Sequence, residues 1–213
     1  MDADAESRQA SRMLRSAEPP ILSDLPDIPG IGLAMSLAPE LEVALRTLAD
    51  VLLVNDFPGA TLTRPEREMI ATSVSAVNDC FFCMDSHGAF AASLLRRQGA
   101  ADAEALVETL KSGGLERLSA KMQGLLAIAR TVARDARGLK HGDTAPAMAA
   151  GATSGDIQLA VLIASAFSMY NRMVEGLRAP TAAEASAYAE RAEQIADLGY
   201  VAQPEETEPA ATP

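Results

Sequence analysis

The chain has 213 residues, of which 48% are hydrophobic and 4% aromatic, and its formal net charge is −11. This length suits one domain with a proper core, and the alanine-rich, aromatic-poor composition favours helices over strands. The acidic charge argues against nucleic-acid binding, which needs clustered lysine and arginine. We expect no membrane span, because no apolar run approaches the roughly 18 residues required, and the N-terminus lacks the apolar core of a signal peptide. The composition therefore predicts a soluble, cytoplasmic protein.

The predicted elements begin with an N-terminal arm, residues 1–38, in which four prolines (Pro19, Pro20, Pro26 and Pro29) predict an extended or partly disordered segment. Residues 39–200 form a single predicted helical domain, and residues 201–213 a disordered acidic tail. Apolar spacing and helix breakers predict helices at about residues 39–55, 63–77, 80–98, 101–111, 119–136, 156–177 and 181–198. The helix at 156–177 is apolar on most sides, so we expect it in the core or in an oligomer interface.

Local sequence signals mark where several helices begin. Thr63 and Glu66 form a capping-box pattern, and Thr153 caps the apolar helix. Asn78 or Asp79 is the expected N-cap of the helix that contains Cys80. Whether this pair interrupts the preceding helix or only kinks it stays open.

The motif that carries reactive side chains is Cys80-Phe-Phe-Cys83, which contains the only two cysteines of the chain. At roughly 100° per residue, Cys80, Cys83 and His87 fall within an arc of roughly 60° on one helix face. A cysteine in the first helical turn meets unpaired N–H groups and the positive end of the helix dipole, which favour a thiolate. Two thiols and an imidazole on one face therefore predict a redox site, with His87 as the base that takes or relays a thiol proton.

Other interpretations of these residues remain open. The cysteines could be two small buried hydrophobic residues, or they could bind zinc together with His87 and a fourth ligand, Glu68 or His141. Arg172 lies in the apolar helix, where a charge needs a partner; it could form an interface ion pair or border the active site.

The spacing of a glutamate, eleven residues, Cys-x-x-Cys, three residues and a histidine fits Glu68, Cys80, Cys83 and His87. It resembles the signature of the alkylhydroperoxidase D (AhpD)-like proteins of the carboxymuconolactone decarboxylase superfamily. AhpD itself is similar but has a histidine between its cysteines, where Phe82 stands here. One member of the proton relay is therefore missing from this chain.

Two further patterns carry the same resemblance. The Asn-x-Cys-x-aromatic-Cys pattern that begins at Asn78 is most similar to that of the peroxidase-related branch of these proteins. A second match lies at residues 167–172, Phe-Ser-Met-Tyr-Asn-Arg, followed by Gly176. The resemblance covers roughly residues 60–100 and 155–180.

The resemblance implies an all-α, compact AhpD-like helical domain that assembles as a trimer or hexamer through apolar helices. It also implies a thiol-dependent antioxidant enzyme in which Cys83 attacks a hydroperoxide and Cys80 closes the disulfide. His87 and Glu68 would move the protons, and the partners would be the hydroperoxide and a thiol or disulfide reductant protein. No cofactor or metal is expected. The alternatives are a decarboxylase of a muconolactone-like acid, or a non-catalytic helical protein with an inert or metal-binding thiol pair.

Overall fold

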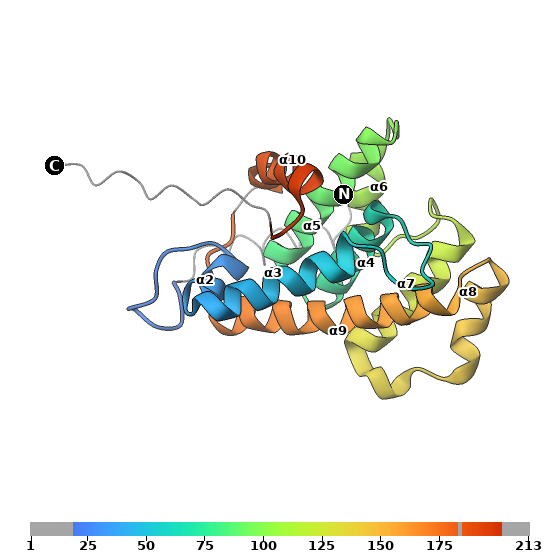
Figure 1. Cartoon of the computed structure of the whole chain (residues 1–213), viewed down its shortest axis with the longest axis horizontal. Coiled ribbons are helices and arrows are strands. Elements are labelled where there is room, and N and C mark those ends of the chain that lie inside the picture. The colour runs from blue at the N-terminus through green and yellow to red at the C-terminus, as the bar shows by residue number, and fades with distance from the viewer. Residues whose placement is uncertain (1–18, 183–184, 202–213) are drawn as a thin grey trace.

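The computed structural model describes residues 19–182 and 185–201, and in these residues it is all-helical without a strand (Figure 1). This confirms the predicted fold class. The α-helices are α2 (Ile31–Ser36), α3 (Pro39–Leu53), α4 (Arg64–Val77), α5 (Phe81–Arg97), α6 (Ala103–Lys111), α7 (Ala120–Asp135), α8 (Ala145–Ala149), α9 (Ser154–Gly176) and α10 (Ala189–Leu198). Three short 3-10 helices accompany them, η1 (Ala136–Gly138), η2 (His141–Thr144) and η3 (Ala185–Tyr188).

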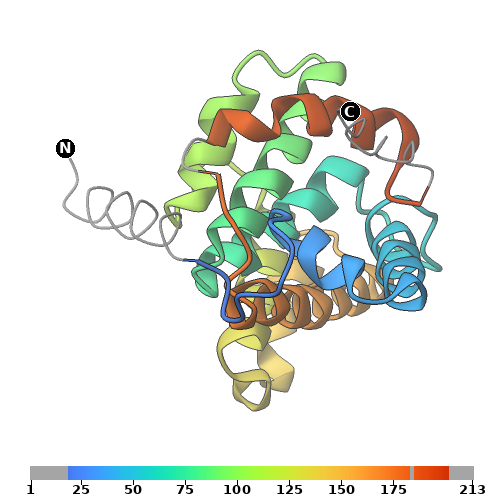
Figure 2. The ribbon, with the colours of Figure 1, turned by 90° about the vertical axis from the view of Figure 1, so that its left-hand side faces the viewer.

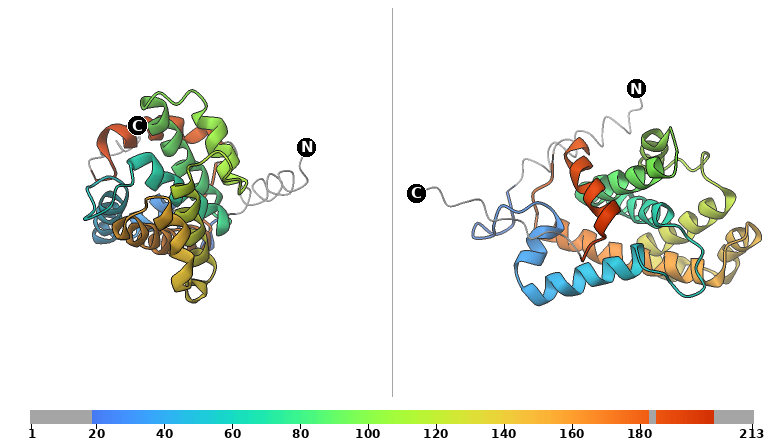
Figure 3. Two further views of the ribbon diagram at one scale, coloured as in Figure 1. Left: turned by 90° about the vertical axis from the view of Figure 1, so that its right-hand side faces the viewer. Right: turned by 45° about the horizontal axis from the view of Figure 1, so that its top comes forward.

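The helices α4 and α5 form the centre of the molecule. They pack against each other, with α9 beneath α4 and α10 across α5 (Figure 2). Figure 3 (right) shows α10 beside α5 from a third direction. Because α4 has neighbours on several sides, most of its residues are buried, including polar ones. The two helices that carry the sequence motif therefore lie where their side chains are removed from bulk water.

The predicted capping box at Thr63 and the predicted cap at Thr153 are both present, and the second is also a capping box. Thr63 and Glu66 bond reciprocally at the start of α4, and Thr153 and Asp156 do the same at the start of α9. Asp156 also accepts hydrogen bonds from the backbone N–H groups of Thr61 and Leu62. Burial acts to raise the pKa of Asp156, but these bonds and the Lys121 ammonium hold it well below its usual range. The carboxylate thus joins the segment before α4 to the start of α9.

The start of the motif helix differs from the prediction. Asn78 is the C-cap of α4 rather than the N-cap of α5, and Asp79 adopts a left-handed conformation with φ of 54°. The backbone N–H of Cys80 donates to Ser75 O at 3.0 Å, and that of Asp79 to Ala76 O at 3.4 Å, which is the Schellman arrangement of a helix C-terminus. Cys80 itself is the N-cap of α5. The pair therefore interrupts the helix, because aspartate tolerates the left-handed region better than most residues.

The last part of the N-terminal arm differs from the predicted extended segment. Residues 19–30 contain no regular helix, as the prolines predict, but α2 follows at once and buries Leu33 completely. Gly30 allows this turn, since its φ is 58° and a Cβ there would lie 2.1 Å from the Phe82 ring. Its N–H donates to Pro180 O at 2.9 Å, which fixes the arm to the segment after α9. Residues 1–18 of the predicted arm and 202–213 of the predicted tail lie outside the described residues.

The long helix α9 and the last helix α10 require two further corrections. By length and composition α9 is apolar enough to cross a membrane, contrary to the prediction that no segment approaches this length. Half of its apolar window is buried against the rest of the chain, including α4 and α7, so it serves here as a core helix. The last helix begins at Ala189 rather than at residue 181, because η3 precedes it.

Candidate active site

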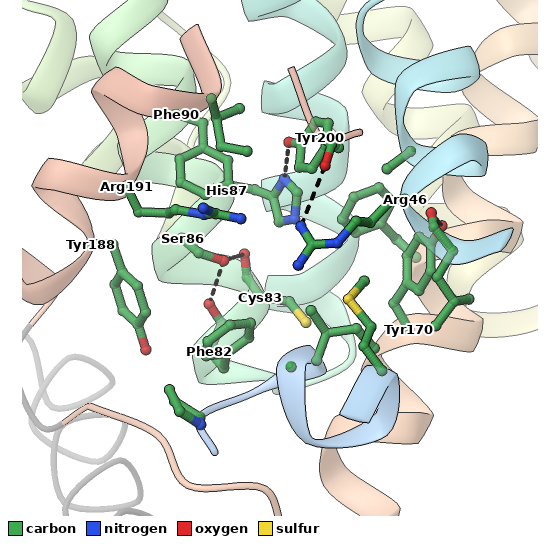
Figure 4. Close-up of a pocket in the computed structure, with 18 of the residues that line it drawn as sticks. Arg46, Phe82, Cys83, Ser86, His87, Phe90, Tyr170, Tyr188, Arg191 and Tyr200 are labelled. Atoms are coloured by element: carbon green, nitrogen blue, oxygen red, sulfur yellow. Dashed lines mark hydrogen bonds between the residues drawn. The ribbon is translucent and has the colours of Figure 1, made fainter. Parts of the chain in front are cut away.

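A cavity of about 380 Å³ opens beside the motif helix (Figure 4). Its walls come from α2, α3, α5, α9 and α10 and from Tyr200, which follows α10. Cys83 and His87 both line it. Its size is that of a site for a small organic molecule.

The two cysteines differ in their access to this cavity. Both are unpaired thiols; Cys83 is 2% exposed and lines the cavity, whereas Cys80 is 0% exposed and lies outside the lining. Leu33 of α2 and Val174 of α9 belong to the apolar cluster that surrounds them. A molecule in the cavity therefore meets the Cys83 thiol first.

The predicted thiolate at Cys80 is not supported. A hydrogen bond with the Cys83 side chain and burial raise the pKa of Cys80 well above its ordinary value. The backbone N–H of Cys83 at the start of the helix acts in the opposite direction, but it is a smaller effect. The thiol of Cys80 consequently stays protonated at neutral pH and can donate its proton toward Cys83.

Glu68 and His87 are in direct contact, although they come from different helices. Glu68 on α4 is 0% exposed, and its Oε2 lies 2.7 Å from His87 Nδ1 on α5. The predicted Glu68–His87 pairing is therefore present in the structure. It arises because α4 and α5 pack together along this part of their length.

Tyr200 is a third member of this group that the sequence analysis did not identify. Its hydroxyl donates to Glu68 Oε1 at 2.7 Å and lies 3.3 Å from His87 Nδ1. Burial, the Glu68 charge and the hydrogen bond to Glu68 raise the pKa of Tyr200 well above 10.0, so its hydroxyl remains a donor.

The position of Tyr200 depends on Gly199 and Asp50. Gly199 ends α10 with φ of 74°, and the Asp50 carboxylate accepts the N–H groups of Tyr200 at 2.6 Å and Val201 at 3.1 Å. No spacing rule links Tyr200 to the motif, because the contact joins residues 132 positions apart. The sole local sequence signal for the position of Tyr200 is that it directly follows Gly199, the glycine that ends α10.

These contacts fix the protonation pattern of the His87 ring. Glu68 is an acceptor at Oε2, so Nδ1 carries the proton and donates it, and Nε2 is left as the basic nitrogen. Phe167 of α9 lies edge-to-face against the ring at 4.5 Å, and Phe90 at 5.1 Å. The ring is 12% exposed and lines the cavity together with Cys83.

Phe82 occupies the position between the cysteines and is part of the cavity wall. Its ring packs edge-to-face with Tyr188 at 5.5 Å and fills the space beside Gly30. It offers no proton to the site. The imidazole that lines the cavity together with Cys83 is therefore that of His87, which contacts Glu68 and Tyr200.

Several predicted candidates lie away from the cavity. His141 is exposed in η2, and Arg172 is exposed on α9 with its guanidinium bonded to Ser168 O. Neither lines the cavity. In residues 19–182 and 185–201 no group of three or more histidine, cysteine or acidic side chains is arranged to hold a metal ion. The zinc ligand set considered from the sequence is thus not assembled.

Asn78 has a structural role that differs from the predicted one. Its Nδ2 donates to Asn171 Oδ1 at 2.8 Å, and Asn171 Nδ2 donates to Ser75 Oγ at 3.1 Å. This partly buried network joins the end of α4 to α9. It thereby holds the turn that positions Cys80.

A family model matches part of the chain. Residues 39–111 match the model of the carboxymuconolactone decarboxylase family, a segment that contains Glu68, Cys80, Cys83 and His87. No curated protein matches the chain.

Two solved structures share the fold. One is an uncharacterized peroxidase-related protein from Silicibacter sp. TM1040, with 24% identity over 82% of this chain and 93% of that chain and a TM-score of 0.63. The other is an uncharacterized peroxidase-related protein from Ralstonia eutropha JMP134, described as an alkylhydroperoxidase AhpD core, with 21% identity over 84% of this chain and 86% of that chain and a TM-score of 0.60. Residues 39–111 thus resemble the carboxymuconolactone decarboxylase family, and the chain shares its fold with these two peroxidase-related structures.

Proposed function

We propose that the protein is a thiol-dependent peroxidase that reduces hydroperoxides through the Cys80–Cys83 pair. The observation that carries this proposal is the order of groups at the cavity. Cys83 faces the cavity, Cys80 lies buried behind it, and His87 is held on the same wall by a buried carboxylate. A redox cysteine of this kind needs access to substrate, a base and a resolving partner, and the positions of Cys83, His87 and Cys80 support these three roles.

In the first step His87 Nε2 takes the proton of the Cys83 thiol. The thiolate attacks the terminal oxygen of the hydroperoxide, so an S–O bond forms and the O–O bond breaks. The departing alkoxide takes the proton from His87 and leaves as an alcohol. Cys83 is oxidised to a sulfenic acid, and the hydroperoxide is reduced by two electrons.

In the second step the Cys80 sulfur attacks the sulfenic sulfur of Cys83. An S–S bond forms, the S–O bond breaks, and the hydroxyl leaves with the Cys80 proton as water. Cys80 suits this role because it is closed to solvent and its thiol hydrogen bonds with Cys83. A dithiol protein of the cell would then reduce the disulfide and itself become oxidised. The cytoplasm, which keeps such pairs reduced, is the compartment we propose.

Glu68 and Tyr200 act through His87. The carboxylate stabilises the imidazolium that forms when the thiol proton is taken, and Tyr200 stabilises the carboxylate. Because position 82 is a phenylalanine and not a histidine, His87 is the imidazole in the cavity that accepts the proton of Cys83.

The test is the consumption of cumene hydroperoxide by the fully reduced protein in a stopped-flow mixer. We expect one equivalent to be consumed by the wild type and by Cys80→Ser, and none by Cys83→Ser. His87→Ala should slow the reaction by roughly 10²-fold, in the range of a lost general base. His141→Ala is the matched control, because that histidine is exposed and outside the cavity. Consumption that is unchanged in Cys83→Ser would reject the proposal.

The family match also favours a second candidate, decarboxylation of a muconolactone-like acid. Such a reaction has no oxidised or reduced sulfur and does not require the dithiol. The Cys80→Ser/Cys83→Ser double variant separates the candidates, because it would retain decarboxylation and lose peroxide reduction.

A further inference from the structure

One side of the cysteine pair is closed by residues 19–36, which we call the N-terminal cover. Leu33 of the cover is 0% exposed and belongs to the apolar cluster that contains Cys80 and Cys83. Further residues of the cover that pack against this cluster are Leu25, Ile28 and Ile31. In Figure 4 the Cys83 side chain points toward the blue ribbon of α2, the helix at the end of the cover.

The burial of the two sulfurs decides what can reach them. Cys80 is 0% exposed and Cys83 is 2% exposed. Cys83 is open to the cavity, whose volume of about 380 Å³ admits a small molecule and not a folded protein. Thiol–disulfide exchange requires the attacking sulfur to bond directly to a sulfur of the disulfide. A small thiol can therefore meet Cys83 in the cavity, whereas the cysteine of a protein reductant is kept away by the cover.

The N-terminal cover is fastened through its backbone and through one close contact. Its described residues bond to the segment after α9 at Ile21, whose N–H donates to Leu177 O at 3.1 Å, and at Gly30, whose N–H donates to Pro180 O at 2.9 Å. Gly30 has φ of 58°, and a Cβ there would lie 2.1 Å from the Phe82 ring. A side chain at position 30 would therefore weaken the closed position of the cover through backbone strain and through this clash.

The cover has little buried surface of its own. Most of residues 19–29 are exposed, and the buried residues of the cover are Gly30, Leu33 and Ala34. The central helices α4 and α5, in contrast, bury most of their residues. Segments with few buried apolar contacts open at a lower free energy than core helices do. The cover can thus open while the helices that carry Glu68, Cys83 and His87 stay folded.

We infer that the N-terminal cover is a gate for the reductant, which opens so that a dithiol protein can reach Cys83. The inference rests on the proposed function for the existence of the Cys80–Cys83 disulfide. In the open state a thiolate of the reductant attacks the Cys83 sulfur. A mixed disulfide forms, the Cys80–Cys83 bond breaks, and Cys80 takes up the proton that the first thiol gave to solvent. The second thiol of the reductant then attacks the mixed disulfide and releases Cys83 as a thiol, so the reductant loses two electrons and two protons.

The test compares the reduction of the oxidised protein by thioredoxin and by dithiothreitol. Diamide forms the disulfide, so the test does not depend on peroxide reduction. With thioredoxin the wild-type rate should level off as the concentration rises, because opening of the gate becomes limiting. With dithiothreitol, which the cavity can hold, the rate should stay proportional to concentration.

Two variants weaken the closed cover, Gly30→Ala through the backbone and Leu33→Ala through the apolar cluster. Each should raise the limiting rate with thioredoxin by about tenfold or more, and Gly30→Ala should leave the rate with dithiothreitol nearly unchanged. Gly151→Ala is the matched control. Gly151 also has a positive φ, 93°, but a Cβ there would meet no atom within 4 Å and it lies outside the cover. Its limiting rate should equal that of the wild type.

Hydrogen exchange of the wild type, followed by mass spectrometry, tests the gate without a variant. The amides of residues 19–36 should exchange faster than those of α4 and α5. Exchange as slow as that of α4, a thioredoxin rate that is the same in Gly30→Ala and in the wild type, or no reduction by thioredoxin in any of these proteins would overturn the inference. The first two results in a protein that consumes peroxide would leave the proposed function intact. A gated disulfide in a protein that does not consume peroxide would support the gate and reject the peroxidase.

Discussion

The hydrogen bond from Tyr200 to Glu68 allows a quantitative test of the buried cluster. Tyr200→Phe removes the hydroxyl and keeps the ring, which stacks on His87 at 6.0 Å and contacts Phe90 at 6.2 Å. The change leaves Glu68 Oε1 buried without its 2.7 Å donor. Because the raised pKa of Tyr200 keeps the hydroxyl protonated, the lost interaction is a neutral donor on a carboxylate at neutral pH.

A hydrogen bond to a charged group contributes about 1.5–3 kcal/mol. We therefore expect the free energy of unfolding to fall by about 2 kcal/mol. In a domain of this size that lowers Tm by about 4–8 °C. Urea denaturation followed by far-ultraviolet circular dichroism, at one fixed protein concentration, measures the change.

Tyr170→Phe is the matched control. Its hydroxyl is also buried but donates to a neutral acceptor, Leu45 O, at 3.0 Å. We expect a loss of about 1 kcal/mol, typical of a neutral hydrogen bond. If the two variants differ by less than about 0.5 kcal/mol, or Tyr200→Phe is the more stable, Tyr200 does not support a buried carboxylate and the argument fails.

Three further predictions concern the site and the assembly. Glu68→Gln removes the charge that contacts His87, so the peroxide reaction at neutral pH should slow by roughly 10²-fold in stopped-flow measurements. The helix content measured by circular dichroism should stay unchanged. A change in rate below twofold would exclude Glu68 from the site. Cys83→Ser removes the Cys83 hydrogen bond that raises the pKa of Cys80, but the burial that also raises it remains, and Cys80 is 0% exposed. Alkylation of Cys80 in this variant should therefore be negligible at neutral pH and increase only above the ordinary thiol range of about 8.5, as measured by peptide mass spectrometry; fast alkylation at pH 7 would contradict this. Leu162 and Met169 are exposed apolar residues on one side of α9, so we expect the chain to form a trimer or hexamer through this helix. Light scattering that gives a monomer mass at micromolar concentration would refute this assembly.

Features governed by short-range rules could be predicted from the sequence. The Thr63–Glu66 and Thr153–Asp156 capping boxes depend on residues three apart, and both are present. The i, i+4 relation of Cys83 and His87 likewise places both on one helix face and on one cavity wall. Glu68 depended on the family resemblance, because its contact with His87 joins two helices.

The remaining features depend on tertiary contacts or on competing local rules. Asp79 matches the residue types of an N-cap and also those of a left-handed C-terminal turn, and the packing of α4 against α5 selects the turn. A hydrogen bond with Cys83 and burial in the cluster that includes Leu33 raise the pKa of Cys80, the opposite of the effect expected from the helix start. Tyr200, Arg46 and Arg191 come from three separate parts of the chain, and only the folded arrangement brings them to one cavity.

The most direct test of the account is peptide mapping after one equivalent of cumene hydroperoxide has been added to the reduced protein. The wild type should lose two hydrogens within the single peptide that contains Cys80 and Cys83. Cys80→Ser should instead give a sulfenic acid on Cys83, trapped by dimedone, because the resolving thiol is absent. A dimedone adduct on Cys80 in the Cys83→Ser protein, or disulfides between chains in the wild type, would contradict the assignment of Cys83 as the attacking thiol and Cys80 as its resolving partner.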